Sequence, residues 1–237
     1  MTHQARGQSR VIPFEYSVVR SSRKTAAIHV SARGVSVRIP HHVKDDFVLS
    51  FLQSKVSWVV SKLDAQSKKQ ALVPKLKIGS PVMWMGQSLD INYRQGTKKQ
   101  LSQGDSGFVV EWPSLPSESD LQNLFVQYFK RQAKKFLTLE TLKQAETMGL
   151  HDSLDSIGFR RTKSKWGHCT SKGAIQYNWL IMGAPLNVIH YLVVHEVAHL
   201  KYPHHQSEFW EFVSRYCDDY QACNKWLKQD GLKLAWI

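Results

Sequence analysis

The chain has 237 residues, of which 42% are hydrophobic and 22% are charged, so it can form a packed core and is not an intrinsically disordered protein. No apolar run reaches the roughly 18 residues of a membrane-spanning helix, and the first residues lack the apolar stretch of a secretory signal. Three cysteines without CxxC spacing argue against a disulfide framework and a cysteine-based zinc ribbon. We therefore expect a soluble, cytoplasmic protein that does not bind a membrane.

The formal net charge of +13 is concentrated in the first half of the chain. Residues 1–117 hold 17 Lys and Arg against 7 Asp and Glu, whereas residues 118–237 hold 15 against 12. Such a basic excess favours a polyanionic partner, nucleic acid among them, or an acidic substrate, but it also occurs on surfaces that have no partner. The charge by itself leaves these alternatives open.

The first 116 residues predict a basic, β-rich region with one helix. Alternating apolar residues on both sides of Arg33-Gly34 predict a hairpin over residues 25–40. Apolar residues at a spacing of three and four predict a helix over residues 43–69. Three short alternating segments separated by glycines then predict a meander, over residues 82–85, 88–93 and 108–112.

A proline-containing segment, residues 112–117, is the predicted linker to a second domain over residues 117–237. Ser117 and Asp120 have the spacing of a capping box, which predicts a helix that continues to about Met148. The remaining predicted elements are a hairpin with strands over 164–170 and 174–182, and helices over about 185–200, 207–217 and 221–228.

The most informative motif is His-Glu-Val-Ala-His at residues 195–199. Residues four apart lie on one face of a helix, so His195 and His199 can bind one cation through neutral imidazoles. Glu196 would then lie beside the cation, where it can take a proton from a metal-activated water. His205 follows the predicted helix end at Pro203 and can supply a third ligand, which leaves one tetrahedral position open, as in catalytic zinc sites.

Other interpretations of these residues stay open. His204, Glu208 or Glu211 could replace His205 as the third ligand, and helical histidines are often hydrogen-bonded core residues without a metal. The basic residues between 160 and 165 are expected to face solvent, with phosphate binding as the alternative; they are Arg160, Arg161, Lys163 and Lys165.

Three further residues are candidates for substrate binding. An extended peptide can add to the edge of a sheet, and the predicted strand with Gln176 and Asn178 could provide that edge. His168 could polarise the carbonyl oxygen of a substrate.

The segment HEVAHLKYPHHQSEFW, together with KWGHC at 165–169 and QYNWL at 176–180, resembles the YgjP-like zinc metallopeptidases, relatives of the SprT-like group. Residues 20–24 and 38–40 are similar to the amino-terminal pattern of that family.

The resemblance implies a zincin-type domain with one Zn²⁺ per chain, ligated by His195, His199 and His205, and with Glu196 as general base. Two residues depart from known patterns. His168 stands where the family usually has serine, and Tyr202 replaces the glycine of the metzincin motif.

The sequence thus predicts an α+β protein, in which a β-rich region precedes a zincin-like domain that carries HExxH on its active-site helix. The predicted activity is zinc-dependent hydrolysis of peptide bonds in a protein or peptide substrate. The alternative is a nucleic-acid-binding protein with a structural or idle metal site, which would bind through the basic amino-terminal half; no helix-turn-helix or aromatic-flanked recognition motif supports it. HExxH is also compatible with hydrolysis of a non-peptide amide.

Overall fold

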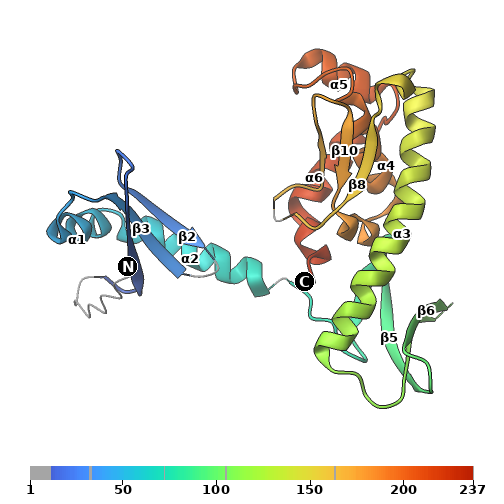
Figure 1. Cartoon of the computed structure of the whole chain (residues 1–237), viewed down its shortest axis with the longest axis horizontal. Helices are drawn as coiled ribbons and strands as arrows, with labels where there is room; N and C mark the ends of the chain where they lie inside the picture. Colours follow the sequence, from blue (N-terminus) through green and yellow to red (C-terminus); the bar gives the residue numbers. More distant parts are fainter. Residues whose placement is uncertain (1–11, 32–33, 72, 105, 163, 237) are drawn as a thin grey trace. The chain divides into compact units, whose positions relative to one another are not determined.

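The computed structural model describes residues 12–31, 34–71, 73–104, 106–162 and 164–236. The chain divides into two compact units, Met1–Leu72 and Val73–Ile237, and each has a hydrophobic core of its own (Figure 1). Within the described residues, no helix combines the length and apolar composition that a membrane crossing requires.

The first unit is a three-stranded sheet with two helices. Strand β3 (Gly34–Pro40) lies in the middle, parallel to β1 (Tyr16–Ser21) and antiparallel to β2 (Ala27–Ser31). The antiparallel pair β2–β3 confirms the predicted hairpin, although its turn residue Arg33 lies outside the described residues. The buried core of this unit is small and consists of Val37, Ile39, Val48 and Leu52.

The single helix expected over residues 43–69 is wrong, because the segment forms two helices, α1 (Asp45–Gln53) and α2 (Val56–Ala71). The break falls at Ser54, whose hydroxyl donates a 2.8 Å hydrogen bond to the Phe51 carbonyl. A serine side chain that bonds the local backbone competes with the helical hydrogen-bond pattern. Apolar periodicity on both sides of Ser54 concealed this break.

The second unit begins with a four-stranded sheet in the order β4-β5-β7-β6. Its strands are β4 (Pro81–Trp84), β5 (Gln87–Gln95), β6 (Gln100–Gly104) and β7 (Gly107–Trp112). The predicted meander is wrong in its pairing: β5 and β7 are parallel, and β6 is an additional strand at the edge. The sequence pattern missed β6 because four of its five residues are polar or glycine.

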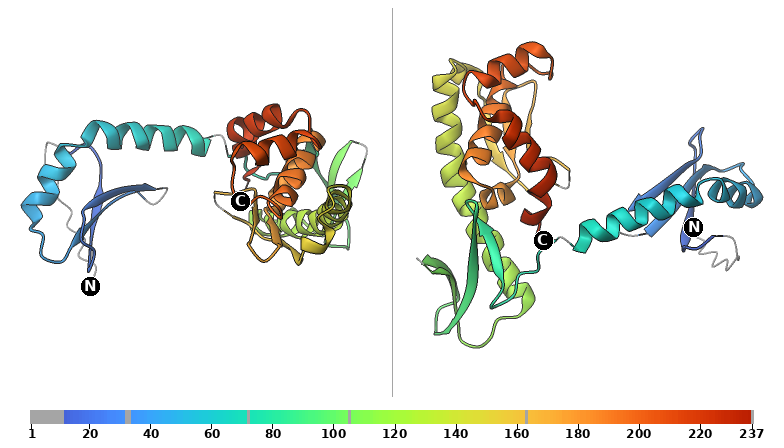
Figure 2. Two further views of the ribbon diagram at one scale, coloured as in Figure 1. Left: turned by 90° about the horizontal axis from the view of Figure 1, so that it is seen from above. Right: turned by 180° about the vertical axis from the view of Figure 1, so that it is seen from behind.

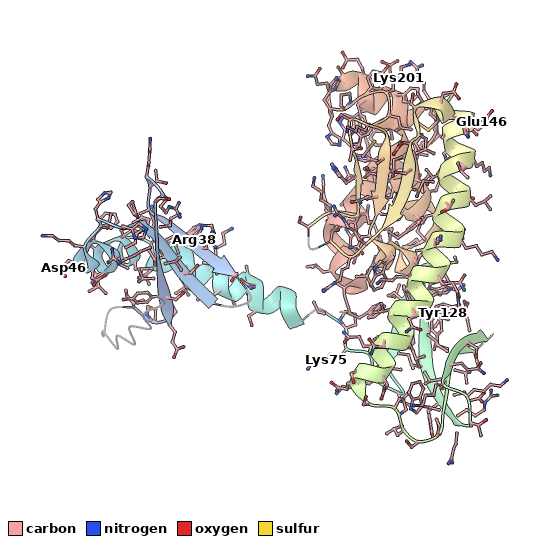
Figure 3. The ribbon with its side chains drawn as sticks, viewed as in Figure 1. Arg38, Asp46, Lys75, Tyr128, Glu146 and Lys201 are labelled. Atoms are coloured by element: carbon pink, nitrogen blue, oxygen red, sulfur yellow. The ribbon has the colours of Figure 1, made fainter. Side chains whose placement is uncertain are left out.

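Helix α3 (Glu118–Thr147) extends along the second unit, past the four-stranded sheet and the part of the unit that follows in the chain (Figure 1). The predicted capping box is present, since the Asp120 amide donates to the Ser117 hydroxyl and the Ser117 amide donates to the Asp120 carboxylate. Tyr128 lies in its amino-terminal half, among the side chains of the four-stranded sheet, and donates a 3.0 Å hydrogen bond to Gln103 of β6 (Figure 3).

The division expected at residue 116 falls inside the second unit, because the sheet before it and the helix after it share one core. The Phe108 ring on β7 lies 5.2 Å from Phe125 and 5.3 Å from Tyr128 on α3, measured between centroids. The proline segment before Ser117 is therefore a connection within one unit. The structure separates the two units near Leu72 instead.

The rest of the second unit consists of helices and a smaller sheet in the order β8-β10-β9 (Figure 2). The predicted hairpin is confirmed by the antiparallel pair β9–β10, but the second strand ends at Tyr177 instead of Met182. Asn178 ends the strand by capping a short 3₁₀ helix with its side chain. The strands are β8 (Ser156–Phe159), β9 (Gly167–Cys169) and β10 (Ala174–Tyr177); the helices are η1 (His151–Ser153), η2 (Trp179–Gly183), α4 (Leu186–Ala198), α5 (Ser207–Ser214), α6 (Tyr220–Asp230) and η3 (Gly231–Leu234).

Candidate metal centre

Helix α4 carries the HExxH motif through the interior of the second unit. It packs against α3, α5, α6 and β9, and most of its apolar side chains are buried. A helix that is apolar on all sides is stable only inside a core. The polar residues His195 and Glu196 at its carboxyl end, with the capping residue His199, therefore stand out as functional candidates.

The structure brings together the three histidines that the sequence proposed as ligands. The potential ligand atoms of His195, His199 and His205 all lie within 4.8 Å of one another. The Nε2 atoms of His195 and His205 are 3.1 Å apart, although the two residues are ten positions apart in sequence. The turn between α4 and α5 returns His205 to the helix end, as the break at Pro203 predicted.

Hydrogen bonds on the far side of two rings orient them for a shared ligand. The Tyr202 carbonyl lies 2.9 Å from Nδ1 of His199, and the Tyr191 hydroxyl lies 3.4 Å from Nδ1 of His195. A contact at Nδ1 fixes the ring and leaves Nε2 free, which is the usual arrangement of metal-binding histidines. Three converging imidazoles with such support are a donor set that fits zinc.

The charge state of the histidines also suits a metal. Burial, and then the neighbouring His199 and His205, lower the pKa of His195 to about 3. Burial lowers the pKa values of His199 and His205 as well. All three imidazoles are consequently neutral near pH 7, which is the form that binds a cation.

Glu196 is buried between α4 and β9, with only 3% of its surface exposed and its Oε2 atom without a hydrogen-bond partner. Burial raises the pKa of its carboxyl group to about 8, and the charge of Lys165 opposes this increase. A buried carboxyl oxygen without a partner is rare in structural roles and marks a site where a ligand or water completes the bonding.

Gly167 on β9 makes the space that Glu196 occupies. A Cβ atom added at Gly167 would lie 2.5 Å from Cδ and 2.6 Å from Cγ of Glu196, closer than any ordinary contact. No sequence pattern indicates that this glycine has a functional role, apart from its position in the KWGHC segment that carries the family resemblance.

A cleft of about 600 Å³ opens over the three histidines and Glu196. One wall is β9 with its flanking residues 164–171, the floor is α4, and α6 contributes Asn224, Leu227 and Lys228. His168 lines this cleft, as expected for a substrate-binding candidate. Lys165, which was expected to face solvent, also lines it, whereas Lys163 lies outside the described residues.

The structure does not bring Gln176 and Asn178 into the cleft. Strand β10, with Gln176, is the middle strand of its sheet, so the free edge beside the cleft belongs to β9. The Asn178 side chain is buried; it donates to the Thr162 carbonyl at 3.1 Å and accepts from the Leu180 amide at 3.2 Å. Both groups of this amide therefore serve the local fold.

The rival third ligands stay outside the histidine cluster that the described residues form. Glu211 pairs with Arg215 at 2.6 Å, Glu208 accepts a hydrogen bond from Ser207, and His204 accepts one from the Gln206 amide. Of these four candidates, only His205 reaches the other two histidines.

Comparisons with known proteins show the family of the chain. The model of the YgjP-like family, described as a metallopeptidase domain, matches residues 24–230. No curated protein matches the chain in sequence. Among solved structures, the metallopeptidase zymogen abylysin of Pyrococcus abyssi is 19% identical with a TM-score of 0.34, over 40% of this chain and 95% of its own. Since the family match covers most of its length, the chain belongs to the YgjP-like family and carries its α+β metallopeptidase domain.

Proposed function

We propose that the protein is a zinc-dependent peptidase with one zinc ion held by His195, His199 and His205. The observation that carries the proposal is the convergence of three neutral imidazoles beside a buried, unpartnered carboxyl group in an open cleft. A bound zinc ion would lower the pKa of a water molecule and polarise the carbonyl group of the scissile bond.

Glu196 acts as the general base in this proposal. Its carboxylate accepts the proton of the attacking water and passes it to the leaving amine. Burial raises the pKa of Glu196 to about 8 in the zinc-free protein, and the positive charge of a bound zinc ion would lower it toward the range in which the carboxylate can accept a proton. Because Gly167 has no side chain, the carboxylate fits closely between α4 and β9 and keeps one position during the reaction.

The substrate would bind as an extended segment along the free edge of β9. An edge strand offers unpaired backbone groups to a peptide, and this edge lies beside the histidine cluster. His168, on the same strand and exposed in the cleft, would position the substrate carbonyl group. Substrate binding in this proposal does not involve Gln176 or Asn178, since neither lines the cleft.

The test combines metal analysis with peptide cleavage by the purified full chain. Wild type is expected to hold about one zinc ion per chain, and His195→Ala is expected to lose it. Glu196→Gln is expected to keep the zinc and to lose about 10²- to 10⁴-fold in kcat/KM, the range of general-base catalysis. Glu211→Gln, an exposed carboxylate outside the cleft, is the matched control and should keep both.

Two results would contradict the proposal. Absence of zinc uptake by wild type would exclude the metal centre, and cleavage by Glu196→Gln at the wild-type rate would exclude Glu196 as the base. The nucleic-acid-binding alternative is supported only by the charge of residues 1–117, and nothing in the described residues adds to it.

A further inference from the structure

We infer that the cleft selects substrates with a carboxylate group close to the scissile bond, and that Lys165 and Lys228 bind this group. The inference rests on the proposed peptidase function and names the substrate class of the same site. Its evidence is the presence of two lysines in the lining of the cleft and the shortage of acidic partners for them among the described residues.

Lys165 reaches the cleft because of its position before β9. Ser164, Lys165 and Trp166 precede the strand directly, and all three line the cleft together with it. The charge of Lys165 lowers the pKa of Glu196, so the ammonium group is near enough to the cleft carboxyl group to act on it.

Lys228 reaches the same cleft from α6. Asn224 and Lys228 are four residues apart, so they share a helix face, and both line the cleft together with Leu227. The Trp166 ring packs on Gly231, where an added Cβ would lie 3.1 Å from the ring. This contact holds the segment beside Lys165 against the end of α6, only three residues after Lys228.

Neither lysine has an ion-pair partner within the described part of the chain. The neighbouring Lys233, in contrast, pairs with Asp230 at 2.6 Å. Among the described residues that line the cleft, Glu196 is the only carboxylate, and it is buried and assigned to the reaction itself. A substrate carboxylate would supply the missing counter-charge for both ammonium groups, and Leu227, which also lines the cleft, would contact the apolar stem of the side chain.

The carboxylate can come from an Asp or Glu side chain or from the carboxyl terminus of a peptide. Binding experiments with the zinc-loaded full chain carrying Glu196→Gln separate these sources without turnover. The probes are fluorescein-labelled octapeptides with a central Ala-Ala bond, in which Glu or Gln occupies one position on either side. Each peptide is prepared with a free and with an amidated carboxyl terminus.

The Glu peptides are expected to bind about fivefold more tightly than the Gln peptides for at least one position, the size expected for partly exposed charge pairs. Lys228→Gln or Lys165→Gln should reduce this ratio to less than about twofold, and Lys228→Glu should abolish it. Lys225→Gln, on the same helix but outside the cleft lining, is the matched control and should keep the fivefold ratio.

Tighter binding of Glu than of Gln in amidated peptides identifies the side-chain carboxylate, and tighter binding of free than of amidated Gln peptides identifies the terminal carboxylate; both support the inference. Equal affinity for all four kinds of peptide would overturn it. An equal loss of the ratio in Lys225→Gln would also overturn it, because the preference would then reflect only the general basic charge.

Cleavage of the same peptides by wild type separates this inference from the proposed function. Acid-selective binding without any cleavage would overturn the peptidase and support the substrate class. Cleavage of the peptides by wild type, together with equal affinity of the Glu196→Gln variant for all of them, would support the peptidase and overturn the substrate class.

Discussion

The two units of the chain differ in how much apolar surface they bury and in what they can hold there. The main core cluster of the first unit has four buried side chains, and residues 1–72 hold 12 Lys and Arg against 4 Asp and Glu. The second unit buries a continuous core that includes an aromatic cluster around Phe129, and it contains the three converging histidines. Its charge is closer to balance, with 20 basic and 15 acidic residues over 73–237.

The size of the core determines which of the two units can contain a buried polar site. Neutral imidazoles and an unpartnered carboxyl group are held in one geometry only if the surrounding core is large enough to offset the cost of burying them. The small first unit offers mainly surface, including Trp58 on α2 with 44% of its area exposed. We therefore expect the chemistry to depend on the second unit and to be insensitive to the first.

The largest effect is expected at Gly167, where the second unit leaves room for Glu196, the proposed base. Gly167→Val should displace Glu196 and reduce kcat/KM by about 100-fold, as small displacements of catalytic groups do, while zinc stays bound. Gly104→Val on β6 is the control, because its added Cβ would meet its nearest atom at 3.9 Å. Unchanged activity in Gly167→Val would show that Glu196 needs no fixed position.

Core substitutions test whether the units are independent in stability. Leu137 on α3 and Leu52 on α1 are both fully buried, so Leu→Ala at either position should cost about 2–5 kcal/mol. Leu137→Ala should lower the unfolding midpoint of the second unit and its zinc content. Leu52→Ala should change only the first unit. A change of more than threefold in the kcat/KM of the Leu52→Ala variant would show that the chemistry depends on the first unit.

The buried carboxyl group of Glu196 predicts a pH dependence of the zinc-free protein. Its folded-state pKa is raised from 4.5 to about 8, so between these values the folded state binds the proton that the unfolded state has lost. This contribution to stability is present at low pH and is lost as the pH rises through 8, so Glu196→Gln should gain about 2 kcal/mol over wild type between pH 6 and pH 9.

Urea unfolding followed by tryptophan fluorescence measures this difference, since seven of the eight tryptophans belong to residues 73–237. Glu211→Gln, at an exposed position, should show no such gain. A difference between Glu196→Gln and wild type that stays constant with pH would contradict the burial of an unpartnered carboxyl group.

The smallest effect is expected from removal of the first unit. A fragment of residues 73–237 should fold, bind zinc and cleave short peptides within about threefold of the full chain, because the second unit has its own core. Zinc analysis and kcat/KM on the same peptide measure this. Loss of zinc in the fragment would show that the first unit supports the metal centre.

Local patterns predicted the elements whose signals lie close together in sequence. The capping box at Ser117 fixed the start of α3, and the spacing of His195 and His199 placed both on one helix face. Polar β6 and the break at Ser54 were missed, because hydrophobic periodicity cannot detect a polar edge strand or a local side-chain bond.

By itself the sequence determined the family, the helix that carries HExxH and the three histidines that are the candidate ligands. These depend on short-range spacing, which the helical repeat converts directly into geometry. Only the tertiary structure decided that β9 and not β10 is the edge beside the cleft, that Gly167 accommodates Glu196, and that Lys228 of α6 lines the same cleft. Such contacts join residues distant in the chain, and their positions follow from how the helices and sheets pack rather than from any local pattern.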